Sequence, residues 1–112
     1  MTVLKREDAA LETIAEGRQR YLAYTDNLMM VVIDFHDGPA AEPDPPHAHP
    51  HEQITYVAAG EVLFFVEGDE PVKLVVGDVI TIPPDVPHTV QPLTEYLRLV
   101  DTFNPIREDF LP

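Results

Sequence analysis

The chain of 112 residues contains no cysteine, so no disulfide framework stabilises it and a reducing compartment is compatible with it. It has no apolar run long enough to cross a bilayer and no charged start followed by an apolar signal segment, so we expect a cytoplasmic protein. Basic residues are few. The chain has seven lysines and arginines and 20 acidic residues, which gives a net charge of -13. That charge disfavours nucleic acid and anionic membranes as partners, and an anionic small molecule would need a local positive anchor.

Helix signals are also scarce, since only residues 7–16 could form a short amphipathic helix, which Gly17 would end. Strand patterns predominate and predict strands at 18–25, 28–35, 53–59, 61–67, 72–76, 79–82 and 96–103. We expect strands 53–59 and 61–67 to form a hairpin about Gly60, and strands 72–76 and 79–82 to meet at a hairpin-type turn of Gly77 and Asp78. Short strands at regular spacing predict an all-β sandwich or barrel in one small domain.

Two of the expected strands, 28–35 and 61–67, are apolar on both faces. A sheet with one face in water should alternate apolar and polar residues, so something must cover the outer face. The N-terminal segment could do so, and a second copy of the chain could do so at least as well. We therefore expect a homodimer that covers the outward face of residues 28–35 or 61–67.

Four of the five histidines fall into two segments, with His47, His49 and His51 in the first and His88 in the second. Prolines at positions 83, 84 and 87 fix the backbone before His88. These histidines could be surface residues of a proline-rich loop, but their clustering favours convergence from two distant segments on one metal ion. The ligand type leaves the divalent transition metal open among zinc, nickel, iron, manganese and copper.

Strand geometry limits which residues can share that ion. Residues two apart lie about 6.6 Å from each other on one face, so His47 and His49 can converge. A straight strand would carry Gln53, which has the same parity, roughly 20 Å away from His47. The chain must therefore bend near Pro50, a residue that donates no ladder hydrogen bond. After such a bend, either His51 or Gln53 could complete the metal site.

The last expected strand carries a second candidate group. By period-two alternation, Asp101 shares the apolar face of strand 96–103 that should line the barrel. Burial without a cation would raise the pKa of this carboxyl and suit it to general acid or base catalysis, although an Asp at a strand end can equally bond a loop amide. Arg107 could supply the positive anchor by binding a carboxylate bidentately, or it could pair with an acidic neighbour.

The two histidine segments resemble the paired motifs of the cupin superfamily. The first motif runs His-x-His, three residues, an acidic residue, six residues and Gly; the matching residues are His47, His49, Gln53 and Gly60. The second runs Gly, five residues, Pro-x-Gly, two residues, His, three residues and Asn. Gly77, Pro83 and His88 fit it, whereas Asp85 replaces the second Gly and Pro92 replaces the Asn. The resemblance implies a double-stranded β-helix, or jelly-roll barrel, with the three histidines and Gln53 as metal ligands.

The run 47–53 and the tail 101–111 also resemble the KdgF group of small single-domain cupins. This resemblance implies a barrel domain at 20–112 after an N-terminal extension at 1–19. It further implies ring opening and ketonisation of 4,5-unsaturated monouronates, which are anionic substrates. Asp101 would be the acid–base residue, Phe103 would shape the pocket and Arg107 would bind the carboxylate. A cupin dioxygenase using iron or copper, or a non-catalytic binding or sensor module, would fit the same ligand set.

Overall fold

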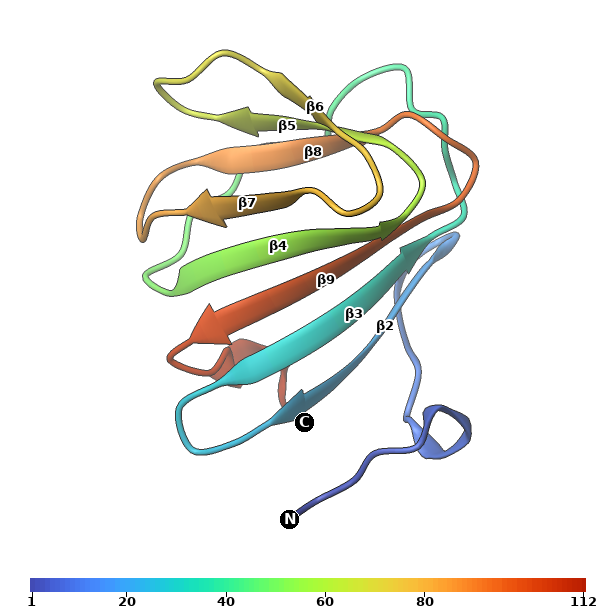
Figure 1. Ribbon diagram of the computed structural model, residues 1–112, viewed down its shortest axis with the longest axis vertical. Coiled ribbons are helices and arrows are strands. Elements are labelled where there is room, and N and C mark those ends of the chain that lie inside the picture. Colours follow the sequence, from blue (N-terminus) through green and yellow to red (C-terminus); the bar gives the residue numbers. More distant parts are fainter.

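The fold consists of antiparallel strands in two sheets, and the computed structural model describes all of residues 1–112 (Figure 1). The strands are β1 (Glu12–Ala15), β2 (Arg18–Tyr24), β3 (Met29–Phe35), β4 (Glu52–Ala59), β5 (Val62–Val66), β6 (Val72–Leu74), β7 (Val79–Ile82), β8 (His88–Pro92) and β9 (Leu97–Asn104). Short 3-10 helices, η1 (Arg6–Asp8) and η2 (Glu108–Phe110), lie near the two chain ends. No helix is long and apolar enough to span a membrane.

The larger sheet has the strand order β1-β2-β3-β9-β4-β7, and the smaller sheet has the order β6-β5-β8. All seven strands expected from the sequence are present, with ends that differ by no more than two residues. The expected all-β architecture of two sheets is therefore confirmed. Sequence analysis missed β8, which begins at His88 directly after the proline-rich turn.

Both expected hairpins are wrong. Strand β4 pairs with β7 and β9, whereas β5 pairs with β6 and β8, so the chain passes from one sheet to the other at Gly60. The turn at Gly77 and Asp78 likewise leads from the smaller sheet to the larger. Gly60 has a φ of +79°, and a Cβ there would lie 2.2 Å from the backbone oxygen of Tyr96. Glycine is required because the crossing brings two backbones together, not because a hairpin turns there.

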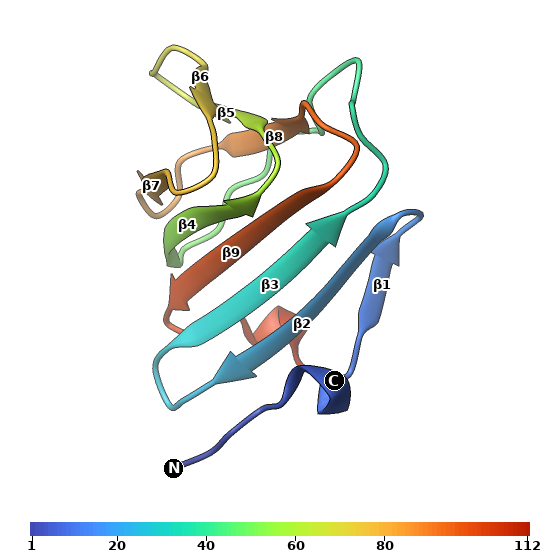
Figure 2. The same cartoon turned by 45° about the vertical axis from the view of Figure 1, so that its right-hand side comes forward.

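The N-terminal helix expected over residues 7–16 is also wrong. The 3-10 helix η1 covers only Arg6–Asp8, and β1 then runs antiparallel to β2 at the edge of the larger sheet (Figure 2). An isolated helix of about ten residues is marginal in water. Pairing with the free edge of β2 satisfies backbone groups of Glu12–Ala15 without a helix.

Inward-facing side chains of the two sheets form the core. Its main cluster consists of Phe35, Val57, Val62, Phe64, Leu74, Ile82, Leu97 and Leu99. A second cluster, made of Met29, Val31 and Phe103, lies on the inner face of β3 and β9. Polar side chains also point inward from the larger sheet, and those of Gln53, Thr55 and Asp101 are buried. Burying such groups is unfavourable unless they are paired, so this part of the interior marks a site rather than a packing layer.

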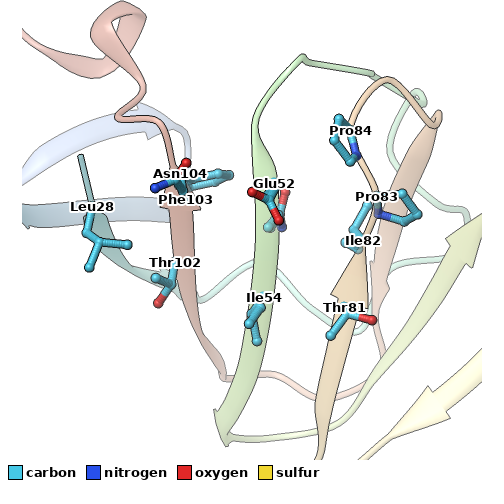
Figure 3. Close-up of a pocket in the computed structure, with 11 residues that line it drawn as sticks. Leu28, Glu52, Ile54, Thr81, Ile82, Pro83, Pro84, Thr102, Phe103 and Asn104 are labelled. Atoms are coloured by element: carbon cyan, nitrogen blue, oxygen red, sulfur yellow. The ribbon is translucent and has the colours of Figure 1, made fainter.

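The outward face of the larger sheet carries several exposed apolar side chains among polar ones. Its most exposed apolar side chains are 43% to 57% exposed, and they belong to Met30, Ile54, Tyr56 and Val79. Figure 3 shows Ile54 between its cross-strand neighbours Thr102 and Thr81, in a groove of about 550 Å³. The outward residues of β5 are half-buried. Of the two faces considered for a dimer, the face of residues 28–35 is therefore the more exposed.

We expect a second copy of the chain to cover this outer face, because soluble monomers rarely leave a contiguous apolar face open to water. The substitution Ile54→Lys would place a charge within that face while leaving the core intact, and it should convert a dimer into a monomer. Sedimentation velocity at micromolar concentrations distinguishes the two states. A monomeric wild-type protein under those conditions would contradict the expectation.

Candidate functional site

The two histidine segments meet where the chain before β4 runs beside the start of β8. The backbone N–H of His47 donates to the carbonyl oxygen of His88 at 3.0 Å, and the N–H of His88 donates back at 2.9 Å. The ring nitrogens available for ligation on His47, His49 and His88 all lie within 4.8 Å of one another. Three imidazoles so placed can hold one metal ion.

Hydrogen bonds to the backbone determine which ring nitrogens remain free. Nδ1 of His88 donates to the carbonyl oxygen of Val86 at 2.8 Å, so Nε2 carries a lone pair, and this atom is buried with no partner. Nδ1 of His49 donates to the carbonyl oxygen of His51 at 3.1 Å, so its Nε2 is an acceptor as well. Burial and the neighbouring histidines lower the pKa of His47 to about 4, and burial lowers the pKa of His49. Both rings are therefore neutral at neutral pH, the state that binds metals.

Gln53 presents an oxygen to the same point. Its Oε1 lies 2.9 Å from Nε2 of His49, while its Nε2 donates to Oγ1 of Thr55 at 3.0 Å. Because Nδ1 of the neutral His49 ring is already the donor, two acceptor atoms face each other with no proton between them. A cation bound to both atoms removes this conflict, and it would also provide the missing partner for Nε2 of His88. The donor set therefore fits a metal ion.

The backbone bends at Pro50 and His51, as the distance argument requires. The bend brings Oε1 of Gln53 within 2.9 Å of Nε2 of His49, whereas His51, whose Nδ1 is buried without a partner, is not among the three histidines whose ring nitrogens gather. The ring of His51 lies beside that of His49, with 5.4 Å between their centres. Asp85, where the family motif has glycine, adopts a φ of +64° and donates its N–H to the carbonyl oxygen of His49 at 2.8 Å. This substitution keeps the left-handed conformation that glycine would adopt there.

Asp101 is connected to this group by hydrogen bonds. Oγ1 of Thr55 donates to Oδ1 of Asp101 at 2.6 Å, and the same hydroxyl accepts from Gln53. Burial raises the pKa of Asp101 to about 6, although the bond from Thr55 and the charge of Arg107 oppose the increase. The expectation of a buried carboxyl with a raised pKa agrees with this environment.

A cavity of about 300 Å³ lies next to these groups and is bounded by side chains from both sheets. It is lined by His47, Gln53 and Asp101, and by Phe103, Arg107 and Phe110. The guanidinium carbon of Arg107 lies 5.1 Å from the ring centre of Phe103 and 4.2 Å from that of Phe110. Arg107 also donates from Nε and Nη2 to Asp109 at 3.0 and 2.8 Å, so it pairs with an acidic neighbour and still lines the cavity.

Sequence analysis did not identify three polar residues of this region, namely Arg18, Arg20 and Thr55. The alternation of the sequence contained a pattern that could have indicated each of them. Thr55 lies two residues after Gln53 and therefore shares its face of the strand. The two arginines alternate in the same way on the expected strand 18–25, and both point into the cavity. Alternation alone did not show which face of that strand would be buried.

Comparison with known proteins places the chain in a family. The model of the cupin domain family matches residues 34–103. Over 107 residues the chain is 36% identical to the pectin degradation protein KdgF of Dickeya dadantii, and the alignment covers 94% of each protein. The structure of KdgF from a Halomonas species matches with a TM-score of 0.87 at 30% identity, covering 98% of this chain and 100% of that one.

An RmlC-like cupin from Shewanella frigidimarina matches equally well, with a TM-score of 0.85 at 38% identity, covering 96% of this chain and 94% of the other. Both matches extend over nearly the whole length of each protein, so they include the barrel together with both terminal segments. The chain belongs to the cupin superfamily, in which it is a small KdgF-like member.

Proposed function

We propose that this protein opens and ketonises 4,5-unsaturated monouronates, with one divalent metal held by His47, His49, Gln53 and His88. The observation that carries the proposal is a buried carboxyl, Asp101, which lines one cavity together with Arg107 and part of the histidine site. The similarity to KdgF, a pectin degradation protein, over nearly the whole chain supports the substrate class.

The proposed reaction is an isomerisation. The substrate is a cyclic enol ether that carries a carboxylate. The bond between the anomeric carbon and the ring oxygen breaks, the anomeric hydroxyl loses its proton, and the former alkene carbon gains one. An aldehyde and a ketone result, and no electrons are exchanged with another reactant. The site therefore has to move one proton and stabilise negative charge on oxygen.

Asp101 is suited to move that proton. Burial raises the pKa of this carboxyl, which favours its protonated form and suits it to accept a proton at one position and release it at another. Thr55 fixes the orientation of Asp101 through its short hydrogen bond. A divalent metal with neutral protein ligands keeps its full charge and would supply Lewis-acid stabilisation of oxygen.

Arg107 and Phe103 would hold the substrate. A guanidinium binds a carboxylate through two parallel hydrogen bonds, which fixes orientation as well as position. The ring of Phe103 lies beside His49, with 5.6 Å between ring centres, and forms an apolar wall of the cavity. The wall would limit access of water to the reacting carbons.

The direct test is incubation of the metal-loaded protein with the 4,5-unsaturated monouronate that a polysaccharide lyase produces from polygalacturonate. Loss of the ultraviolet absorbance of the conjugated double bond, with appearance of the keto product by NMR, is the expected result. Fully metal-loaded protein that leaves this monomer unchanged would refute the proposal. Oxygen uptake with another substrate would then favour a dioxygenase.

The substitution Arg107→Ala should mainly raise KM, by about 10-fold or more, because a hydrogen-bonded charge pair contributes about 1.5–3 kcal/mol in ground and transition states alike. Steady-state kinetics on the unsaturated monouronate separate KM from kcat. Lys73→Ala is the matched control, since it removes one exposed cation from the smaller sheet. A fall in kcat at unchanged KM would contradict a binding role.

A further inference from the structure

Cations are scarce in this chain, yet three of its seven lysines and arginines line the cavity beside the histidine site. The side chains of Arg18, Arg20 and Arg107 are only 16%, 13% and 12% exposed. Removing a guanidinium from water is unfavourable unless other groups compensate it. In a protein with a net charge of -13, this concentration of buried cations favours an anionic ligand in the cavity.

Each of the three side-chain nitrogens of Arg18 already donates to a carboxylate of the protein. Its Nε donates to Asp37, and its Nη1 and Nη2 donate to Asp44 at 2.6 and 3.1 Å. These two carboxylates raise the pKa of Arg18, with the hydrogen bond to Asp44 as the main cause. Arg18 therefore ties the loop before β4 to β2 and has a structural role.

Arg20 and Arg107 differ from Arg18 because each has one carboxylate partner. Arg20 donates from Nε and Nη2 to Glu12, and Arg107 donates from the same two atoms to Asp109. Nη1 of each arginine has no protein partner and is not sealed from solvent. The two carboxylate partners are more than half exposed, at 53% and 58% of their side-chain surface. Water can therefore solvate them when a ligand anion takes their place.

The ring of Phe110 brings these two guanidinium groups together. The guanidinium carbon of Arg20 lies 3.9 Å from the ring centre, and that of Arg107 lies 4.2 Å from it. The two carbons are therefore no more than about 8 Å apart, because both lie about 4 Å from the same point. Both arginines also line the same cavity, so a ligand carboxylate in it lies near both guanidinium groups and can accept hydrogen bonds from them.

We propose that Arg20 acts with Arg107 to bind the substrate carboxylate, which makes Arg20 a specificity-determining residue for the reaction proposed above. This inference rests on that proposed function for the identity of the substrate. Glu12 competes with the substrate for the same donors, so its charge limits the affinity for acids. The edge strand β1 thus tunes the selectivity of the site for a free carboxylate.

The test compares kcat/KM for the unsaturated monouronate with that for its methyl ester, which has the same shape and no charge. Wild-type protein should prefer the acid, and Arg20→Gln should reduce this preference by about 10-fold while activity on the ester remains. Arg20→Lys should give an intermediate value because it keeps the charge and loses the two-pronged geometry. Lys73→Gln, which removes an exposed cation, should leave the preference unchanged.

Glu12→Gln provides an independent test because it acts in the opposite direction. It should lower KM for the acid a few-fold without affecting the ester, a gain that misfolding cannot produce. An acid-to-ester ratio that is the same in wild type and Arg20→Gln would overturn the inference. So would a ratio that Glu12→Gln leaves unchanged.

A binding experiment separates failure of this inference from failure of the proposed function. Calorimetric titration of the metal-loaded protein with galacturonate and with galactose measures carboxylate recognition without turnover. Galacturonate should bind at least 10-fold more weakly to Arg20→Gln than to wild type, with galactose unaffected. That outcome supports the role of Arg20 even if unsaturated monouronates are not converted. Equal affinities of the wild type and Arg20→Gln for galacturonate would refute the role of Arg20, even if the protein does convert unsaturated monouronates.

Discussion

His88→Ala is expected to lose stoichiometric metal binding while remaining folded. The substitution removes one of three ring nitrogens that gather within 4.8 Å. The hydrogen bonds between His47 and His88 are made by the backbone alone, so the pairing of the two segments should survive. Since loss of a group that merely supports a ligand weakens metal binding by 10-fold to 100-fold, loss of a ligand should weaken it by at least about 10²-fold. Metal content after dialysis and gel filtration measures the effect.

Thermal unfolding gives a second readout. A metal at about 100 times its Kd stabilises a folded protein that binds it by about 2.7 kcal/mol, and His88→Ala should gain none of this. His51→Ala and His36→Ala are matched controls, because neither residue belongs to the group of gathered nitrogens. Gln53→Ala should weaken binding, whereas His51→Ala should not. One bound ion per chain in His88→Ala, or loss of the ion in His51→Ala, would show that the proposed ligand set is wrong.

The gathering of the three histidines was easier to predict than the pairing of the strands around them. His47, His49 and His88 were identified because ligand spacing is local within each segment. The bend at Pro50 followed from distance alone, since no straight strand could bring Gln53 to the same point. The two hairpins could not be excluded in this way. A glycine with positive φ permits many chain paths, and the contact that selects the path at Gly60, with the backbone of Tyr96, is distant in sequence.

The roles of charged residues are likewise hard to predict when they depend on contacts with residues distant in the sequence. Arg20 occupies an inward position on an expected strand, and parity puts it on one face with Arg18. Its proposed role depends on Phe110 and Glu12, which come from opposite ends of the chain. Similarly, residues 7–16 have an apolar spacing that suits either a short helix or an edge strand. Only the free edge of β2 decides between them, because it supplies backbone partners to Glu12–Ala15.

Asp101→Asn is expected to make the metal-free protein more stable at neutral pH. The folded-state pKa of about 6 exceeds the ordinary value of 3.8, so the folded protein binds this proton more tightly than the unfolded chain does. Wild-type stability is therefore highest, as far as this group is concerned, below pH 3.8, and it falls as pH rises through about 6. Above that pH the penalty is about 3 kcal/mol, which asparagine does not incur. Urea unfolding in the presence of a chelator, at pH 4 and at pH 7, measures the free energy of unfolding of both proteins. If Asp101→Asn gained the same stability at both pH values, Asp101 would not be a buried titrating carboxyl.

The same substitution should reduce kcat on an unsaturated monouronate by about 10²-fold or more, the usual contribution of general acid–base catalysis. Asparagine has nearly the same size and can still accept the hydrogen bond from Thr55, but it cannot exchange a proton. Metal content should be unchanged, since Asp101 is not among the proposed ligands, and this serves as the control. The inflection of kcat that titration of Asp101 gives in the wild type should be absent from the pH profile of the variant. A variant that is more stable, fully metal-loaded and still as fast as wild type would remove Asp101 from the chemistry and assign its burial to structure alone.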